Sequence, residues 1–322
     1  MDMKLYFAPI EGIGGYIYRN AHQKYFGGAD TYFSPFLAPT QDHSFTTKEK
    51  MDVLPEHNPT LKLVPQILTN QPEAFLWAAE EMEKHGYQEV NLNLGCPSGT
   101  VVSKKKGAGF LGFPEELEQF LDEIFSRVRI SVSVKTRLGM EEAGEFERLL
   151  EIFNRYPICE LIVHPRVRTQ LYRKTPDWGA FPRAQENSRI PLGYNGDIFT
   201  AAAYERVVSE FPGLSSVMLG RGILGNPGLL REIRTGQVMT KEELQDFLQE
   251  VYREYRKAMP GEKPVYFKMK ELWFYLGPTF TNGEPYLKKI RKAKRLEEYE
   301  AAVAALFREQ ELIPGAGFPG TP

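Results

Sequence analysis

Short apolar runs recur along the first two thirds of the chain, and segments with helical periodicity separate them. Within 114–128, apolar residues stand at i, i+3, i+4, i+7 and i+8, the spacing of one buried helix face. The expected strands are Leu5–Pro9, Tyr32–Phe36, Leu63–Leu68, Glu89–Leu94, Ser131–Thr136, Leu161–His164, Pro191–Tyr194 and Val217–Leu219. Eight strand–helix repeats over roughly 235 residues predict an α/β fold, a (β/α)8 barrel. A doubly wound open sheet is the alternative, because periodicity does not reveal closure.

From about Asn226 onward the pattern changes to helices alone. A second apolar stripe runs through 244–255. Further helical segments are expected at Lys268–Leu276, Leu287–Leu296 and Tyr299–Phe307. The predicted parts are a barrel over 1–238, an all-helical domain over 239–310 and a flexible Pro/Gly-rich tail over 311–322.

Composition narrows the class of protein. With 42% hydrophobic and 25% charged residues the chain resembles an ordinary globular protein. Its apolar runs are too short to cross a membrane, and Lys4–Ile10 already has a strand pattern, so no secretory leader is expected. Two cysteines make neither a disulfide framework nor a metal site. We therefore expect a cytoplasmic, reduced, metal-free protein.

Basic residues are clustered although the net charge is only −2. The clusters are Lys104–Lys106; Arg166, Arg168, Arg173 and Lys174; and Lys288, Lys289, Arg291, Lys292, Lys294 and Arg295. A basic stripe on a nearly neutral protein is typical of an RNA contact surface, but equally of a solvated helix face. The pattern alone leaves both interpretations open.

Polar side chains stand near the carboxyl ends of several predicted strands. Strand alternation places Lys135 and Arg137 on the face opposite the valines of their strand, and Asn91 and Asn93 share a face on theirs. The other strand ends carry Gln66, His164 and Asn195. Buried polar groups need partners, so this ring satisfies either itself or a polar ligand. An inward lysine requires an anion or a carboxylate.

The two cysteines differ in context. Cys159 lies inside the apolar run ICELIV and is expected in the core. Cys96 follows a strand, precedes a proline and begins a loop rich in glycine and lysine, which we expect to be a mobile, cationic lid. A thiol there is accessible, and nearby cations affect its pKa; a merely buried thiol is the alternative.

The last two predicted strands end in glycine-containing turns. Asn195-Gly196-Asp197 follows the seventh strand, and Gly220-Arg221-Gly222 follows the eighth. Phosphate sites of barrel enzymes lie at these two loops, where glycines let the backbone approach and an arginine supplies charge. A phosphate site beside amide, lysine and histidine groups suggests a phosphorylated planar cofactor, and flavin mononucleotide (FMN) fits.

With these motifs the chain resembles the tRNA-dihydrouridine synthase family of flavin enzymes. The matching segments are Ala8–Gly12, Gln66, Asn91–Ser98, Lys104–Leu111, Val134–Gly139, His164–Tyr172, Asp177-Trp178, Asn195–Asp197 and Gly220–Gly222. The Asn93-x-Gly95-Cys96-Pro97 element with its basic glycine loop is the most specific. The resemblance covers roughly residues 4–235, and the segment 272–277 resembles the family's RNA-binding helical domain.

The resemblance implies a role for each matching position. The residues implied to hold FMN are Ala8, Pro9, Ile10, Gln66, Lys135, His164, Asn195, Gly196, Asp197, Gly220 and Arg221. Cys96 is implied as the general acid and Asn93 as a residue that orients the uracil. The expected substrate and RNA contacts include Arg137, Arg166, Arg168, Lys104, Lys105, Lys288, Lys289, Arg291, Lys292 and Arg295. NADPH is the implied reductant, and the family's mode of tRNA binding implies a monomer.

Three positions depart from the family pattern. Ile10 replaces a methionine, Gly14 stands where a threonine-like residue is usual, and Pro165 replaces a glycine. They leave the target uridine and the subfamily open rather than the reaction. The enzymatic alternative is an FMN barrel that acts on a small pyrimidine, such as a dihydroorotate or dihydropyrimidine oxidoreductase. The non-enzymatic alternative is an RNA-binding or scaffold protein with a degenerate barrel.

Overall fold

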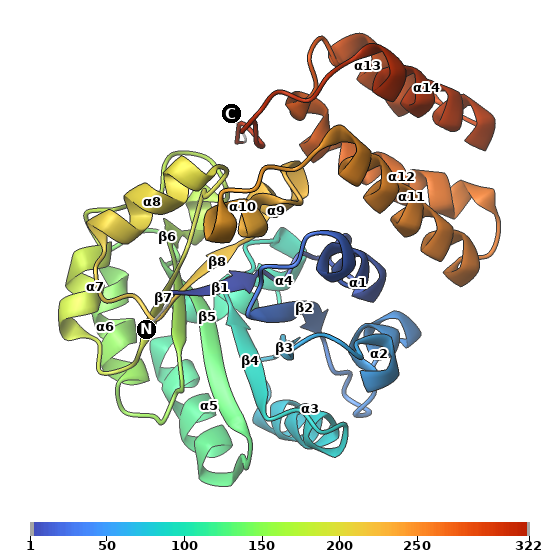
Figure 1. The fold of residues 1–322 in the computed structure, drawn as a ribbon. Coiled ribbons are helices and arrows are strands. Elements are labelled where there is room, and N and C mark those ends of the chain that lie inside the picture. Colours follow the sequence, from blue (N-terminus) through green and yellow to red (C-terminus); the bar gives the residue numbers. More distant parts are fainter. Residues whose placement is uncertain (1–2, 321–322) are drawn as a thin grey trace.

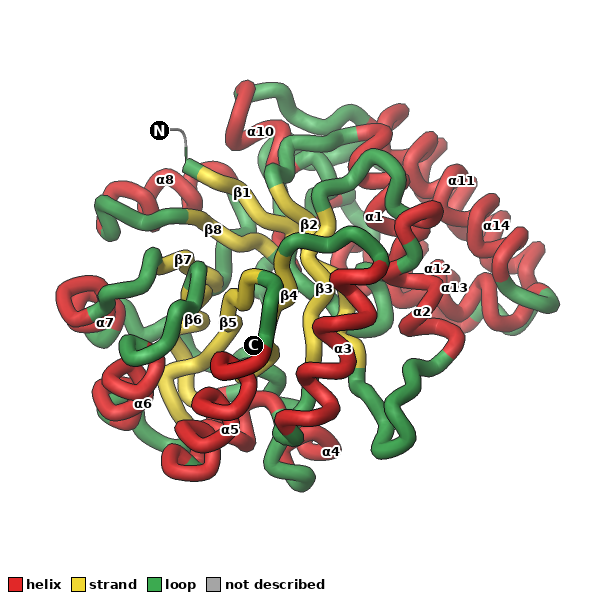
Figure 2. Tube along the Cα trace, turned by 90° about the horizontal axis from the view of Figure 1, so that it is seen from below, coloured by secondary structure: helices red, strands yellow, loops and turns green. Residues whose placement is uncertain are grey.

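Eight parallel strands close into a barrel in chain order, from β1 round to β8 and back to β1. The structure is a computed structural model that describes residues 3–320. Figure 2 shows the strands as an inner ring surrounded by helices. The strands are β1 Lys4–Phe7, β2 Thr31–Leu37, β3 Leu63–Ile67, β4 Glu89–Leu94, β5 Ser131–Gly139, β6 Leu161–Val167, β7 Leu192–Asn195 and β8 Ser216–Leu219. The predicted barrel is confirmed, and the open-sheet alternative is excluded.

The barrel is covered by helices that follow the strands. They are α1 Tyr16–Tyr25, α2 Thr47–Val53, α3 Pro72–Lys84, α4 Gly99–Val102, α5 Pro114–Arg127, α6 Glu145–Phe153, α7 Phe181–Asn187, α8 Ala201–Glu210, α9 Arg221–Gly225 and α10 Leu229–Thr235. The expected stripe of α5 is buried at Leu117, Phe120, Leu121 and Ile124. Proline opens both α3 and α5 at the position where a missing N–H costs no hydrogen bond.

Two separate apolar groups hold this arrangement together. The larger one fills the space between the strands and the surrounding helices. The smaller one fills the barrel interior and consists of Tyr6, Ala8, Phe33, Val64, Ile162 and Met218. We call this smaller group the apolar plug. The polar groups of the barrel lie on the side of the plug where the carboxyl ends of all eight strands meet.

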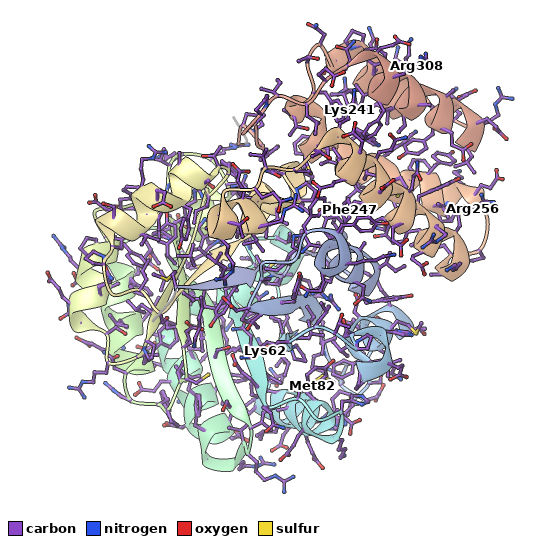
Figure 3. The ribbon with its side chains drawn as sticks, viewed as in Figure 1. Lys62, Met82, Lys241, Phe247, Arg256 and Arg308 are labelled. Carbon is purple, nitrogen blue, oxygen red and sulfur yellow. The ribbon has the colours of Figure 1, made fainter. Side chains whose placement is uncertain are left out.

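A helical region follows the barrel and packs on one side of it (Figure 1). Its helices are α11 Lys241–Ala258, α12 Glu262–Leu276, α13 Glu284–Lys292 and α14 Leu296–Glu309. Phe247 of α11, labelled in Figure 3, is fully buried against α1, where its ring meets those of Tyr18 and Phe26 edge-on at 5.3 and 5.4 Å. Burying one such ring contributes about 1.5–3 kcal/mol. The ammonium of Lys268 on α12 donates to the carbonyl of Gly12, 2.8 Å away.

The boundaries at 238 and 310 stay predictions, as does the flexibility of the tail over 311–322. Residues 311–320 lie against the rest of the molecule: the N–H of Ile313 donates to the carbonyl of Thr279 at 2.8 Å, and Phe318 is only 3% exposed. The last two residues lie outside the described part of the chain.

One expectation about the core is wrong. Cys159 is exposed, because it precedes β6 at the amino end of the barrel, where the chain enters the strand from outside. Its neighbours Ile158 and Leu161 in the same run are buried in the core. Between residues 3 and 320 no helix is long and apolar enough to cross a membrane.

Candidate active site

A cavity of about 350 Å³ opens at the carboxyl ends of the strands, and all eight strands or the turns after them contribute to its wall. Fourteen residues expected at the site line this cavity. They are Ala8, Pro9, Ile10, Gln66, Asn93, Cys96, Lys135, Arg137, His164, Asn195, Gly196, Asp197, Gly220 and Arg221. A larger hollow of about 850 Å³ lies outside the barrel between α6 and α7 and contains none of them. The structure therefore brings the strand-end residues to one place.

A chain of side-chain amides forms the floor of the cavity. Gln66 donates to Asn91 at 2.8 Å, and Asn91 donates to the hydroxyl of Ser133 at 2.9 Å. Asn93 in turn donates to Gln66 at 2.7 Å. All four side chains are at most 7% exposed. The ring of polar groups thus satisfies itself in part, while Gln66 and Asn93, which line the cavity, each keep one amide N–H for a ligand.

Asn93 also fixes the start of the loop that carries the thiol. Its carbonyl oxygen accepts the backbone N–H groups of Gly95 and Cys96, at 3.0 and 2.9 Å. The amide chain of the floor and the backbone of the thiol loop are therefore one hydrogen-bonded unit. In this structure Asn93 directly positions Cys96.

The glycine-rich loop packs closely over the cysteine. A 3-10 turn, η2, covers Gly107–Gly112, and the N–H of Ala108 donates to the carbonyl of Cys96 at 3.0 Å. Gly107 has a φ of 57°, and a Cβ there would lie 2.9 Å from that carbonyl oxygen. Only glycine fits this position without displacing the backbone. The expected movement of the loop as a lid stays a prediction.

The thiol of Cys96 is half-buried in the cavity wall. Burial raises its pKa, and the positive charges of Arg137 and Lys135 offset this only in part. The neighbouring cations do affect the pKa of this thiol, as expected, but their effect is smaller than that of burial and acts in the opposite direction. Because the pKa is raised, the thiol is protonated at neutral pH and can donate a proton.

Lys135 is a half-buried cation in the wall of the cavity. Burial and the neighbouring Arg137 lower the pKa of its ammonium to about 7. Among residues 3–320 its ammonium has no hydrogen bond and no ion pair. A half-buried cation without a carboxylate partner favours an anionic ligand.

Arg137 has a structural role that the sequence did not reveal. It is 1% exposed, its Nε donates to the carbonyl of Gly95 at 2.9 Å, and one Nη donates to Val167 and Leu171 at 3.1 and 2.8 Å. It therefore clamps the thiol loop to the segment after β6. Its side chain reaches the cavity wall but not the outer surface.

Arg166, expected as an RNA contact, is instead fully buried. Its guanidinium forms a bidentate ion pair with Asp197 and donates to the ring of His164 at 2.8 Å. The alternation of β6 turns this side chain inward, so its charge holds the turn after β7. Burial and the surrounding cations, Arg137 foremost, keep the pKa of His164 well below its usual value, so the imidazole is neutral.

Arg221 lies at the end of the cavity formed by the last two turns. It pairs with Asp197 at 2.6 Å, and its guanidinium lies 4.6 Å from the ring centre of Tyr172 and 5.3 Å from that of Phe199. Asn195 is fixed by donating to the carbonyl of Met218 at 2.8 Å.

Several aromatic cavity residues were not assigned a role from the sequence. They are Phe36, Tyr172, Phe199, Phe274 and Tyr275. The last two come from α12, so the helical region completes the cavity mouth. Phe274 is 62% exposed and Tyr172 is 43% exposed. The sequence did contain a signal for Phe274, because this large apolar residue falls on the solvent face of its helix. Its position in the helical region, far along the chain from the strand ends, gave no indication that it lies at the cavity.

The remaining expected RNA contacts lie away from the cavity. Lys104 is exposed, Lys105 pairs with Glu116 at 2.9 Å, and Arg168 is half-buried. Lys288, Lys289, Arg291, Lys292, Lys294 and Arg295 are all exposed. Arg291 pairs with Glu284 and Arg295 with Glu298. Within the described chain, Lys288, Lys292 and Lys294 form no ion pair.

A closed (β/α)8 barrel with a cationic, thiol-bearing cavity at its carboxyl end defines a TIM-barrel enzyme. One solved structure of similar fold is 2-naphthoyl-CoA reductase, with a TM-score of 0.56 and 11% identity; the match covers 73% of this chain and 50% of that one. Another is histamine dehydrogenase from Rhizobium sp. 4-9, with a TM-score of 0.54 and 11% identity; the match covers 76% of this chain and 46% of that one. At this identity the likeness concerns the fold alone.

Sequence comparison identifies the family. The family model Dihydrouridine synthase (Dus) matches residues 6–313. The chain is 26% identical to tRNA-dihydrouridine(16) synthase of Aquipseudomonas alcaligenes over 94% of its own length and 99% of that protein's. It is 27% identical to tRNA-dihydrouridine synthase B of Shewanella oneidensis, in a match that covers 85% of this chain and 86% of that protein. The chain belongs to the dihydrouridine synthase family, which confirms the resemblance, and is an oxidoreductase that forms dihydrouridine in tRNA.

Proposed function

We propose that the cavity binds FMN, that NADPH is the reductant, and that Cys96 protonates the uridine that is reduced. The observation that carries this proposal is the position of a protonated thiol in the wall of a cationic cavity formed by all eight strands. The target uridine is left open. We further propose that the protein acts as a cytoplasmic monomer.

The chemistry of the cavity fits a flavin phosphate. Lys135 offers an ammonium without a carboxylate partner, and Gln66 keeps a spare amide N–H. At the opposite side Arg221 supplies a guanidinium beside the backbone of Gly196 and Gly220. Gly222 packs so closely on Ile198 that a Cβ would lie 2.0 Å from its carbonyl oxygen. A cationic, glycine-walled end is suited to a phosphate, and the amide floor to a polar ring edge.

Each residue near Cys96 then has a defined task. FMN, once bound and reduced by NADPH, would supply the hydride that adds to carbon 6 of uracil. The Sγ of Cys96 donates its proton to carbon 5 from the other face of the ring. Asn93 and Arg137 hold the thiol loop through the backbone of Gly95 and Cys96. The neutral His164 and the cation Lys135 form the cofactor side of the cavity.

A base that is stacked in folded RNA must leave the stack to reach Cys96. We propose that Tyr172 and Phe274, two exposed aromatic rings at the mouth, contact the extruded base or its neighbours. Exposed cations on α13 and in the loop at Lys104 would contact backbone phosphates. The buried Arg166 has no part in this surface.

The test is to incubate the purified protein with NADPH and unmodified tRNA and to map dihydrouridine by position. We expect a yellow protein, oxidation of NADPH and dihydrouridine at one or a few positions. A colourless protein would contradict the cofactor, and activity with NADH but not NADPH would contradict the reductant. Reduction of free pyrimidines but not of tRNA would favour the small-molecule alternative.

A further inference from the structure

The described end of the chain returns from the helical region toward the barrel (Figure 1). Phe318 is its anchor, since its ring is only 3% exposed. The ring centre lies 5.6 Å from that of Phe199, 5.6 Å from that of Phe274 and 5.1 Å from that of Tyr275. One terminal side chain thus contacts both the turn after β7 and helix α12.

Two glycines let this segment approach the barrel. A Cβ on Gly225 of α9 would lie 2.6 Å from the backbone nitrogen of Phe318. A Cβ on Gly317 would lie 2.1 Å from the carbonyl oxygen of Phe199. Both distances are far below any contact that a side chain permits. The path of the tail is therefore fixed by backbone-to-backbone packing as well as by a buried ring.

Phe318 touches the cavity wall from behind. Phe199, Phe274 and Tyr275 line the cavity, whereas Phe318 does not. Its ring centre also lies 5.8 Å from the guanidinium carbon of Arg221, which is in cation–π range. Arg221 is thereby held among the rings of Tyr172, Phe199 and Phe318 while it pairs with Asp197.

We infer that Ile313–Gly320 is a strap that holds Arg221 in position for the phosphate of the cofactor, with Phe318 as the positioning residue. The inference rests on the proposed function, since it takes the ligand to be FMN. Arg221 has a long side chain, and a guanidinium confined by three rings and a carboxylate loses less freedom on binding a phosphate than a mobile one. The strap provides the third ring.

The experiment compares FMN with riboflavin, which lacks the phosphate. Dissociation constants for both are measured by flavin fluorescence quenching with apoprotein of the wild type, Phe318→Ala, Phe318→Tyr and Arg221→Met. We expect Phe318→Ala to weaken FMN about five- to tenfold and riboflavin less than twofold. Phe318→Tyr keeps the ring and should bind both ligands as the wild type does. Arg221→Met should lower the preference for FMN at least as much.

Each outcome decides a separate point. If Phe318→Ala weakens the binding of FMN and of riboflavin equally, the strap contributes only to the general stability of the protein, and the inference is overturned. An unchanged FMN affinity in that variant would overturn it as well. If Phe318→Ala fails to fold, a chain that ends at Ile313 together with Phe318→Leu gives the same comparison. A wild type that binds neither flavin would instead overturn the proposed function, and the strap with it.

Discussion

The two ends of the barrel are built from the same strands but carry opposite chemistry. At the carboxyl end, Lys135, Arg137 and Arg221 surround a cavity, and Cys96 lies in its wall. At the amino end, Glu89 and Glu160 begin or precede strands; Glu160 accepts hydrogen bonds from Tyr6 at 2.9 Å and Ser215 at 2.5 Å, and Cys159 is exposed beside it.

This difference separates function from scaffold. The acidic end is satisfied internally, since its carboxylate has two hydroxyl partners and the apolar plug lies directly above it. The cationic end keeps Lys135 without a partner in the described chain. Unsatisfied charge at one end of a barrel costs stability, and a bound anion offsets that cost. Matched substitutions at the two ends therefore test the assignment.

The two cysteines give the largest expected contrast. Cys96→Ala should slow dihydrouridine formation about 10²–10⁴-fold, because the proton for carbon 5 loses its donor. Cys159→Ala should leave the rate unchanged, since its thiol lies at the other end of the barrel. The measurement is a single-turnover assay with tRNA at matched flavin content. Full activity of Cys96→Ala would remove the thiol from the mechanism.

Lys135 should make FMN binding depend on pH. Its pKa of about 7 means that the amine is increasingly neutral above pH 7, so a cofactor that binds the ammonium form must first restore a proton. The affinity for FMN should then fall with rising pH, by up to about tenfold per unit between pH 7 and 9. The charged and titratable groups next to this amine are Arg137 and the thiol of Cys96.

The matched variants for this titration are Lys135→Met and Glu160→Gln. Lys135→Met should bind FMN more weakly at pH 7 and show a flat profile above it. Glu160→Gln changes a charge at the acidic end and should keep the wild-type profile. Fluorescence titration at each pH gives the values. A pH-independent wild type would show that the ammonium of the lysine does not contact the cofactor.

Asn93 tests how far positioning matters within the cavity. Asn93→Ala removes two acceptor contacts to the thiol loop and one donor contact to Gln66. We expect kcat to fall about tenfold, a cost of roughly 1.4 kcal/mol, because the loop no longer holds Cys96 in one place. FMN affinity should change less than kcat. An equal loss of both would mean that Asn93 serves the cofactor rather than the thiol.

The sequence predicted the barrel because period and length are local properties. The strand Glu89–Leu94 was placed to the residue, and inward residues such as Lys135 followed from alternation. What it missed depends on contacts across the fold. Arg166 was expected at the surface, and its burial depends on the ion pair with Asp197, which lies in the turn after β7. The contacts of Phe318 with Phe199 and Phe274 join positions more than 40 residues apart along the chain, which periodicity does not reveal.

The basic stripe on α13 should give the smallest effect. Changing Lys288, Lys292 and Lys294 to alanine removes three exposed cations that form no ion pair in the described chain. If each contacts one phosphate, the slope of log affinity for tRNA against log salt falls by about 2–3, and binding weakens about tenfold near 0.1 M salt. FMN binding should be unaffected, because the stripe lies outside the cavity.

The control removes the same number of charges at the acidic end. Lys4, Lys62 and Arg129 are exposed there, at or just before strands β1, β3 and β5. Their substitution by alanine should change the salt slope little, because the far end of the barrel cannot reach an RNA whose base enters the cavity. Equal salt slopes for the two triple variants would show that the stripe is only a solvated helix face. RNA binding would then depend on the loop at Lys104 and on Tyr172 and Phe274 at the cavity mouth.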